Sequence, residues 1–219
     1  MRKAITRALV LTAVVLVAAG CAERKRIEPT NPTDAAGFVA RGWNFFANGN
    51  FDDALADFAS AIALDADFAD AYVGQGWARL GRSTDSAGML SAVQAFDDAN
   101  VHGANGADVD AGRAAARLGA GGSNLSLADT AAQAALQKDA SFVFAHQSSF
   151  DRRDLLLIEA FARAGQGSLS SALTAAEQIR DSGIEASNPG TWVVNGVTFP
   201  TFEAATLAFL HQLSEEFSG

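Results

Sequence analysis

The chain has 219 residues, with 16 lysines and arginines against 25 aspartates and glutamates, and a formal net charge of −9. This acidity argues against a nucleic-acid-binding protein, because phosphate recognition needs a basic surface. The length suffices for one domain with a substantial core or for a short array of repeats. With only 4 prolines and many alanines, the composition favours helices over sheets, so we expect an all-α array.

Residues 1–20 have the features of a secretory signal peptide, a basic start followed by an apolar run from Ala8 to Ala19. That run is shorter than the roughly 20 residues that cross a bilayer. The sequence Leu16–Cys21 resembles the bacterial lipobox, which implies cleavage before Cys21 and acylation of its sulfur with chains such as palmitate. The alternative is a secreted protein whose only cysteine carries no lipid.

Residues 22–34 are polar and contain Pro29 and Pro32, a composition typical of a flexible or extended tether. Ala22 follows the cysteine where lipoproteins kept in the inner membrane of enterobacteria have aspartate. The resemblance therefore implies a lipid anchor in the outer membrane, with the protein facing the periplasm or the cell surface.

The residues from Ala35 to Leu80 predict a helical hairpin that begins to repeat. Apolar or small residues recur at spacings of three and four in two segments, namely Phe38, Gly42 and Phe45, then Phe51, Leu55, Phe58 and Ile62. Asn48–Asn50 between them favours a turn. A second Gly-Trp pair, Gly76-Trp77, follows Gly42-Trp43 after 34 residues, and this period is typical of stacked helix-turn-helix units.

The first hairpin resembles the tetratricopeptide repeat (TPR) family at most of its consensus positions. The matching residues are Gly42, Phe45, Gly49, Phe51, Ala54, Phe58, Ala61, Leu64 and Asp65, and Ala66 stands where the family usually has proline. The resemblance implies a TPR-like α-solenoid of about four hairpins over residues 35–185. It also implies a concave groove that binds a segment of another protein without catalysis.

The second and third hairpins carry insertions of about four residues, which we expect to form long loops at Gly81–Ser86 and Gly119–Asn124 on one edge of the solenoid. A fourth hairpin is expected from Ser149 to Ile179. We expect the connection before it, Ala140–Ser148, to pack over the array through its phenylalanines.

Residues 186–219 differ in character from the repeats. β-Branched and aromatic residues flank Asn195-Gly196, the strongest short signal for a β-hairpin. Pro200 and Thr201 then open an expected final helix that caps the solenoid, with an apolar stripe formed by Phe202, Thr206, Phe209, Leu210, Leu213 and Phe217.

The candidate binding residues follow from the TPR resemblance, in which the position after the helix glycine faces the concave groove. On this chain the groove set is Val39, Trp43, Phe46, Val73, Trp77 and Leu80. A helix that is apolar on two faces either is buried by its neighbours or offers a binding surface. Both alternatives are open for Trp43 and Trp77.

No motif predicts catalysis, a cofactor or a metal. The three histidines are far apart, and Asp108–Gly112 lacks the closing glutamate of a calcium loop. We expect a lipid-anchored, non-catalytic scaffold or assembly adaptor whose partner is a protein segment. The alternatives are capture of a glycan or small ligand by the indoles, and self-association into a structural assembly.

Overall fold

The computed structural model describes residues 32–217; the predicted signal peptide, Cys21 and most of the predicted tether lie outside this range. The elements run in the order α2 (Ala35–Ala47), α3 (Phe51–Leu64), α4 (Ala69–Arg82), α5 (Ser86–Val101), α6 (Ala107–Ala120), the short 3-10 helix η1 (Gly122–Asn124), α7 (Leu125–Lys138), α8 (Arg152–Gly165), α9 (Leu169–Glu177), the 3-10 helix η2 (Pro189–Thr191), β1 (Val193–Val194), β2 (Val197–Thr198) and α10 (Phe202–Glu216).

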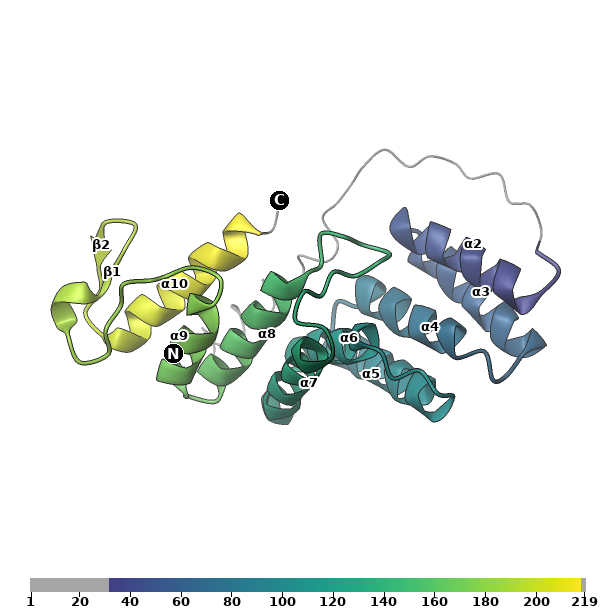
Figure 1. The fold of residues 1–219 in the computed structure, drawn as a ribbon, viewed down its shortest axis with the longest axis horizontal. Helices are drawn as coiled ribbons and strands as arrows, with labels where there is room; N and C mark the ends of the chain where they lie inside the picture. Colours follow the sequence, from purple (N-terminus) through teal and green to yellow (C-terminus); the bar gives the residue numbers. More distant parts are fainter. Residues whose placement is uncertain (1–31, 218–219) are drawn as a thin grey trace.

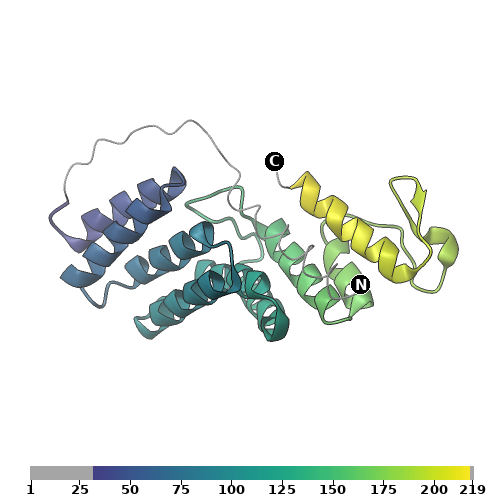
Figure 2. The same ribbon diagram turned by 180° about the vertical axis from the view of Figure 1, so that it is seen from behind.

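Consecutive helices form four hairpins, α2/α3, α4/α5, α6/α7 and α8/α9, and each hairpin contacts the next. Figures 1 and 2 show them stacked along an arc, with α2 at one end and α10 with the β-hairpin at the other. The predicted all-α, TPR-like solenoid is confirmed.

The spacing between hairpins is set by phenylalanines that lie against glycines. A Cβ atom added to Gly42 of α2 would lie 2.7 Å from the Phe58 ring, and one added to Gly74 of α4 would lie 2.3 Å from it. Phe58 therefore fills the space between its own hairpin and the next only because both neighbours lack side chains. Phe96 has the same arrangement one repeat later.

The first turn is as predicted: Asn48 caps α2, and Gly49 takes a positive φ of 73° that glycine adopts without strain. The long loop expected at Gly81–Ser86 is wrong. Only residues 83–85 connect α4 to α5, because the Asp85 carboxylate accepts a hydrogen bond from Gly88 N (2.8 Å) and starts the helix early.

The long loop expected at Gly119–Asn124 is wrong for a similar reason. Gly119 and Ala120 are the last residues of α6, and only Gly121 and η1 connect it to α7. The inserted residues lengthen helical structure: α5 has 16 residues where α3 has 14. The insertions therefore build no long loop edge in these two hairpins.

The C-terminal elements agree with the sequence. Val194 of β1 pairs with Val197 of β2, and Asn195 and Gly196 turn between them with φ of 51° and 77°. Thr201 caps α10 by accepting a hydrogen bond from Ala204 N (3.1 Å). Helix α10 contacts α8, α9 and β1, as expected of a cap. Between residues 32 and 217, no helix is long and apolar enough to cross a membrane.

Candidate binding groove

The predicted groove residues form one apolar stripe along α2 and α4, and every one of them is buried. Their exposed fractions are 4% for Val39, 6% for Trp43, 3% for Phe46, 3% for Val73, 0% for Trp77 and 3% for Leu80. The structure brings together all six residues in the same hydrophobic cluster. Of the two alternatives for Trp43 and Trp77, exposure or burial, the structure shows burial of both indoles.

The segment that covers this stripe connects α7 to α8. We call residues 139–151 the groove loop. Figure 1 shows it leaving the end of α7, extending along the inner side of the arc toward α2 and α4, and returning to α8. Phe142, Phe144 and Phe150 of this loop are 2–4% exposed and belong to the same cluster as the groove stripe. The expected packing of the connection over the array is confirmed.

The loop has its own backbone hydrogen bonds. Phe144 N donates to Phe150 O (2.9 Å), and Arg152 N donates to Phe142 O (2.8 Å). Val143 and Asp151 form an antiparallel bridge between the two arms. The loop is therefore a short, closed hairpin that enters the groove as a unit.

Phe144 lies inside a box of aromatic rings from two helices. Its ring stacks on Trp77 of α4, with centroids 4.0 Å apart and an interplanar angle of 18°. The edges of Trp43 and Phe46 of α2 close the box at 6.0 Å each. Offset stacks and edge-to-face pairs at such distances are attractive beyond the area they bury.

His146, at the tip of the loop, stacks on Trp43 with centroids 3.7 Å apart and the planes nearly parallel. Trp43 Nε1 in turn donates a hydrogen bond to Asp70 Oδ2 of α4 (3.3 Å). Burial lowers the pKa of His146, and the carboxylates of Asp70 and Asp108 oppose that change. Burial also raises the pKa of Asp70, against the hydrogen bond from Trp43 and the charge of His146.

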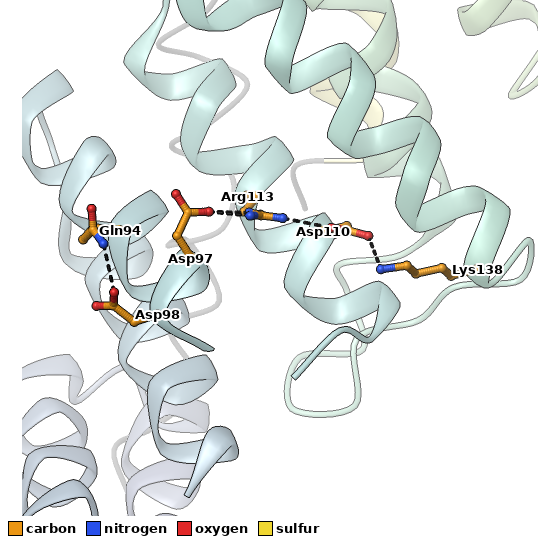
Figure 3. Close-up of polar contacts among 6 residues, drawn as sticks. All are labelled: Gln94, Asp97, Asp98, Asp110, Arg113 and Lys138. Carbon is orange, nitrogen blue, oxygen red and sulfur yellow. Dashed lines mark hydrogen bonds and ion pairs between the residues drawn. The ribbon is translucent and has the colours of Figure 1, made fainter. Parts of the chain in front are cut away.

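The base of the loop is fixed by a line of ion pairs across α5, α6 and α7 (Figure 3). Arg113 Nε donates to Asp97 Oδ1 (2.8 Å), and Arg113 Nη1 lies 3.4 Å from Asp110 Oδ1. The other Asp110 oxygen pairs with Lys138 Nζ (2.6 Å). Lys138 is the last residue of α7, so this line sets the point from which the groove loop departs.

These contacts also account for the acidic motif at Asp108–Gly112. Asp110 is 6% exposed and is engaged by Arg113 and Lys138, so its carboxylate holds α6 against its neighbours. Within the described range, no group of three or more histidines, cysteines, aspartates or glutamates could hold a metal ion.

Two contributors to the groove were missed from the sequence. The sequence offers His146 only as one of three widely spaced histidines, and the structure places its ring in a stack on Trp43. Phe150 was not considered, although its ring contacts Trp77 (5.3 Å) and Phe142 (6.2 Å). This connection between hairpins has 13 residues, whereas the other connections between hairpins have four or five residues. Its length, together with its three phenylalanines, is the signal in the sequence that indicates a buried loop.

No protein-family model matches the sequence, and no curated protein sequence matches it. Solved structures do match. TTC0263, a thermophilic TPR protein of Thermus thermophilus, superposes with a TM-score of 0.50 at 16% identity, over 68% of this chain and 75% of that one. YrrB, a TPR protein with an unusual peptide-binding site, superposes with a TM-score of 0.57 at 18% identity, over 84% of this chain and 91% of that one.

This chain has a TPR fold. At 16% and 18% identity the likeness concerns the fold, and the groove loop must be understood from the chain's own residues. In this TPR array the apolar stripe of the first two hairpins is covered, and the segment that covers it is part of the same chain.

Proposed function

We propose that this protein is a lipid-anchored, non-catalytic interaction module of the bacterial cell envelope. Its TPR array binds a segment of another protein on the concave face of α2 and α4. The observation that supports this most is the aromatic box around Phe144, because it holds an extended aromatic segment with ring contacts from two adjacent repeats. The peptide-binding site for which YrrB is described supports the same class of partner.

The envelope part of the proposal rests on the sequence. Residues 1–20 have the features of a signal peptide, and Leu16–Cys21 resembles a lipobox. Acylation of Cys21 would hold the array at a membrane, outer rather than inner, and facing the periplasm or the cell surface. The test is Cys21→Ala, which we expect to move the protein from the membrane to the soluble fraction. Mass spectrometry should then detect no acyl chains on the protein. Retention in the membrane without acylation would contradict the anchor.

The partner is tested by affinity capture from detergent-solubilised envelopes with the full-length protein as bait. We expect Phe144→Ala, which removes the ring from the box, to capture the partner more strongly than the wild type. We expect Trp43→Ala with Trp77→Ala to capture it less. The matched control is Phe209→Ala on α10, a buried phenylalanine far along the chain from the groove. Equal capture by all four proteins would place the binding surface elsewhere.

Glycan capture and self-association can each be distinguished from binding of a protein segment with the same purified proteins. Stacking of a sugar on Trp43 or Trp77 needs an accessible indole, and both are buried here. Saccharide-dependent quenching of tryptophan fluorescence would favour glycan capture over a protein partner. A mass that rises with concentration in sedimentation would favour self-association.

A further inference from the structure

The groove loop presents its side chains to the groove at every second residue. Phe142 and Phe144 are buried, whereas Val143 and Ala145 between them are exposed, and His146 is again half-buried against Trp43. This alternation is the geometry of an extended strand, whose successive side chains point to opposite sides. The groove therefore contacts positions i and i+2 of an extended arm, Phe142 and Phe144, whereas His146 lies in the turn that follows, where Gln147 N donates to Phe144 O (3.2 Å).

The way the loop is held makes it separable from the groove. Its backbone hydrogen bonds include one between its own two arms, from Phe144 to Phe150, and one to it from Arg152, the first residue of α8, which donates to Phe142. Its contacts with α2 and α4 include the stacks of Phe144 on Trp77 and of His146 on Trp43. A segment closed on itself can leave as a unit without breaking the bonds between its arms, as local openings of compact loops do.

The groove also has a chemical preference at each contact. The second position lies in the aromatic box of Trp43, Phe46 and Trp77, so it selects a flat ring. His146, which follows, stacks on Trp43, and burial lowers its pKa against the charges of Asp70 and Asp108, so this contact favours the neutral ring.

From these contacts we infer that the groove loop is a tethered occupant of the binding groove, and that the partner is an extended protein segment of the pattern aromatic-x-aromatic that exchanges with it. The partner itself rests on the proposed function; the exchange does not. A tethered segment competes at an effective concentration in about the millimolar range, so the wild type binds a free segment weakly until the loop leaves.

The first test measures the loop in the wild type by amide hydrogen exchange with site resolution. The amides of Phe144, Phe150 and Arg152, each a donor within the loop or to its arms, are compared with those inside α4 and α6. We expect the loop amides to exchange at least about tenfold faster than the helix amides and with a weaker dependence on denaturant. Exchange of both groups only through global unfolding would make the loop a permanent part of the core and overturn the inference.

The second test adds a synthetic peptide of residues 140–148 in trans to the full-length protein. We expect binding to the Phe144→Ala protein to be at least about tenfold tighter than to the wild type, because the competing ring is gone. Matched peptides define the pattern: Phe144→Ser in the peptide abolishes binding, whereas Ala145→Ser, at an exposed position, does not. Equal affinity of all three peptides, or of both proteins for the parent peptide, would overturn the inference.

Folding of the Phe144→Ala protein is checked by circular dichroism. If this variant does not fold, the amide hydrogen-exchange measurement on the wild type alone tests the inference. The outcomes also separate this inference from the proposed function. If the Phe144→Ala protein binds the peptide but captures no envelope protein, the exchange of the loop with a free segment is supported and the proposed protein partner is contradicted. Capture that is equal for wild type and Phe144→Ala would keep the partner and remove the role of the loop.

Discussion

Phe58 and Phe144 are both almost completely buried, yet they are held in different ways. Phe58 lies between α2 and α4 against Gly42 and Gly74, where no side chain separates ring from backbone. Phe144 lies in a box of three rings and arrives there on a loop that closes on itself. Two side chains with nearly the same low exposure are therefore covered by different kinds of element, Phe58 by packed helices and Phe144 by a loop.

The largest expected effect concerns the contact between repeats. Phe58→Ala should lower the free energy of unfolding by about 4 kcal/mol, because the ring fills the space between Gly42 and Gly74 and its removal leaves a cavity between two hairpins. Chemical denaturation followed by circular dichroism measures it. A loss below about 2 kcal/mol would mean that the helices adjust to the missing ring. Phe58 would then contribute no more to stability than is expected of Phe144.

Gly74→Ala sharpens this test as a double-mutant cycle with Phe58→Ala. Alone, it should destabilise by about 1–3 kcal/mol, since its Cβ would lie 2.3 Å from the ring. Combined with Phe58→Ala, it should become neutral or stabilising, because alanine is favoured over glycine in a helix by about 1 kcal/mol and the ring is absent. Additive losses would contradict the proposed contact.

Phe144→Ala should cost less, about 2 kcal/mol, because the loop can relax or leave. The helical signal should be kept, and chymotrypsin should cleave the chain between Lys138 and Arg152 faster than in the wild type. Denaturation and limited proteolysis measure the two effects. A loss as large as that of Phe58→Ala, with no change in cleavage, would show that the loop is part of the core.

The boundary of the loop with α8 gives a smaller effect that depends on pH. Asp154 Oδ2 accepts a hydrogen bond from Asp151 N (2.7 Å), and burial raises the Asp154 pKa to about 6 from 3.8. A raised carboxyl pKa contributes stability that is present below about pH 4 and is lost as the pH rises through 6.

Asp154→Asn keeps the hydrogen-bond acceptor and removes the titration. Relative to the wild type, it should gain about 1–2 kcal/mol of unfolding free energy at pH 8 compared with pH 5. Urea denaturation at both pH values measures this difference. Tryptophan accessibility should not change, because the group belongs to the start of α8 rather than to the groove. A difference independent of pH would contradict the assigned burial.

The sequence predicts the contact between repeats better than the groove. Gly42, Phe58 and the 34-residue recurrence of Gly-Trp are local patterns with one structural solution, and the resulting hairpins are confirmed. The burial of Trp43 and Trp77 depends instead on a segment roughly 65–100 residues further along the chain, and no periodicity links the two. The lengths of the turns at residues 83–85 and 121–124 were missed because Asp85 and the glycines can end or extend a helix equally well.

The smallest expected effect is acid-dependent opening of the groove. His146 stacks on Trp43, and burial lowers the pKa of His146 from 6.5, while Asp70 on α4 and Asp108 on α6 oppose this. A depressed histidine pKa contributes stability to the closed loop that is present above about pH 6.5 and is lost as the pH falls below it. Quenching of tryptophan fluorescence by acrylamide should therefore increase between about pH 7.5 and 5.5.

His146→Phe keeps a ring on Trp43 and removes the proton, so the quenching of this variant should not change over the same interval. Trp192 is half-buried in the C-terminal segment, where its Nε1 donates to Glu185 O (2.9 Å), and a Trp192→Phe background removes its signal from both proteins. If the variant responds to acid as the wild type does, His146 is not the source of the response. If neither protein responds, the loop stays closed as His146 takes up its proton, and the neighbouring carboxylates outweigh its burial.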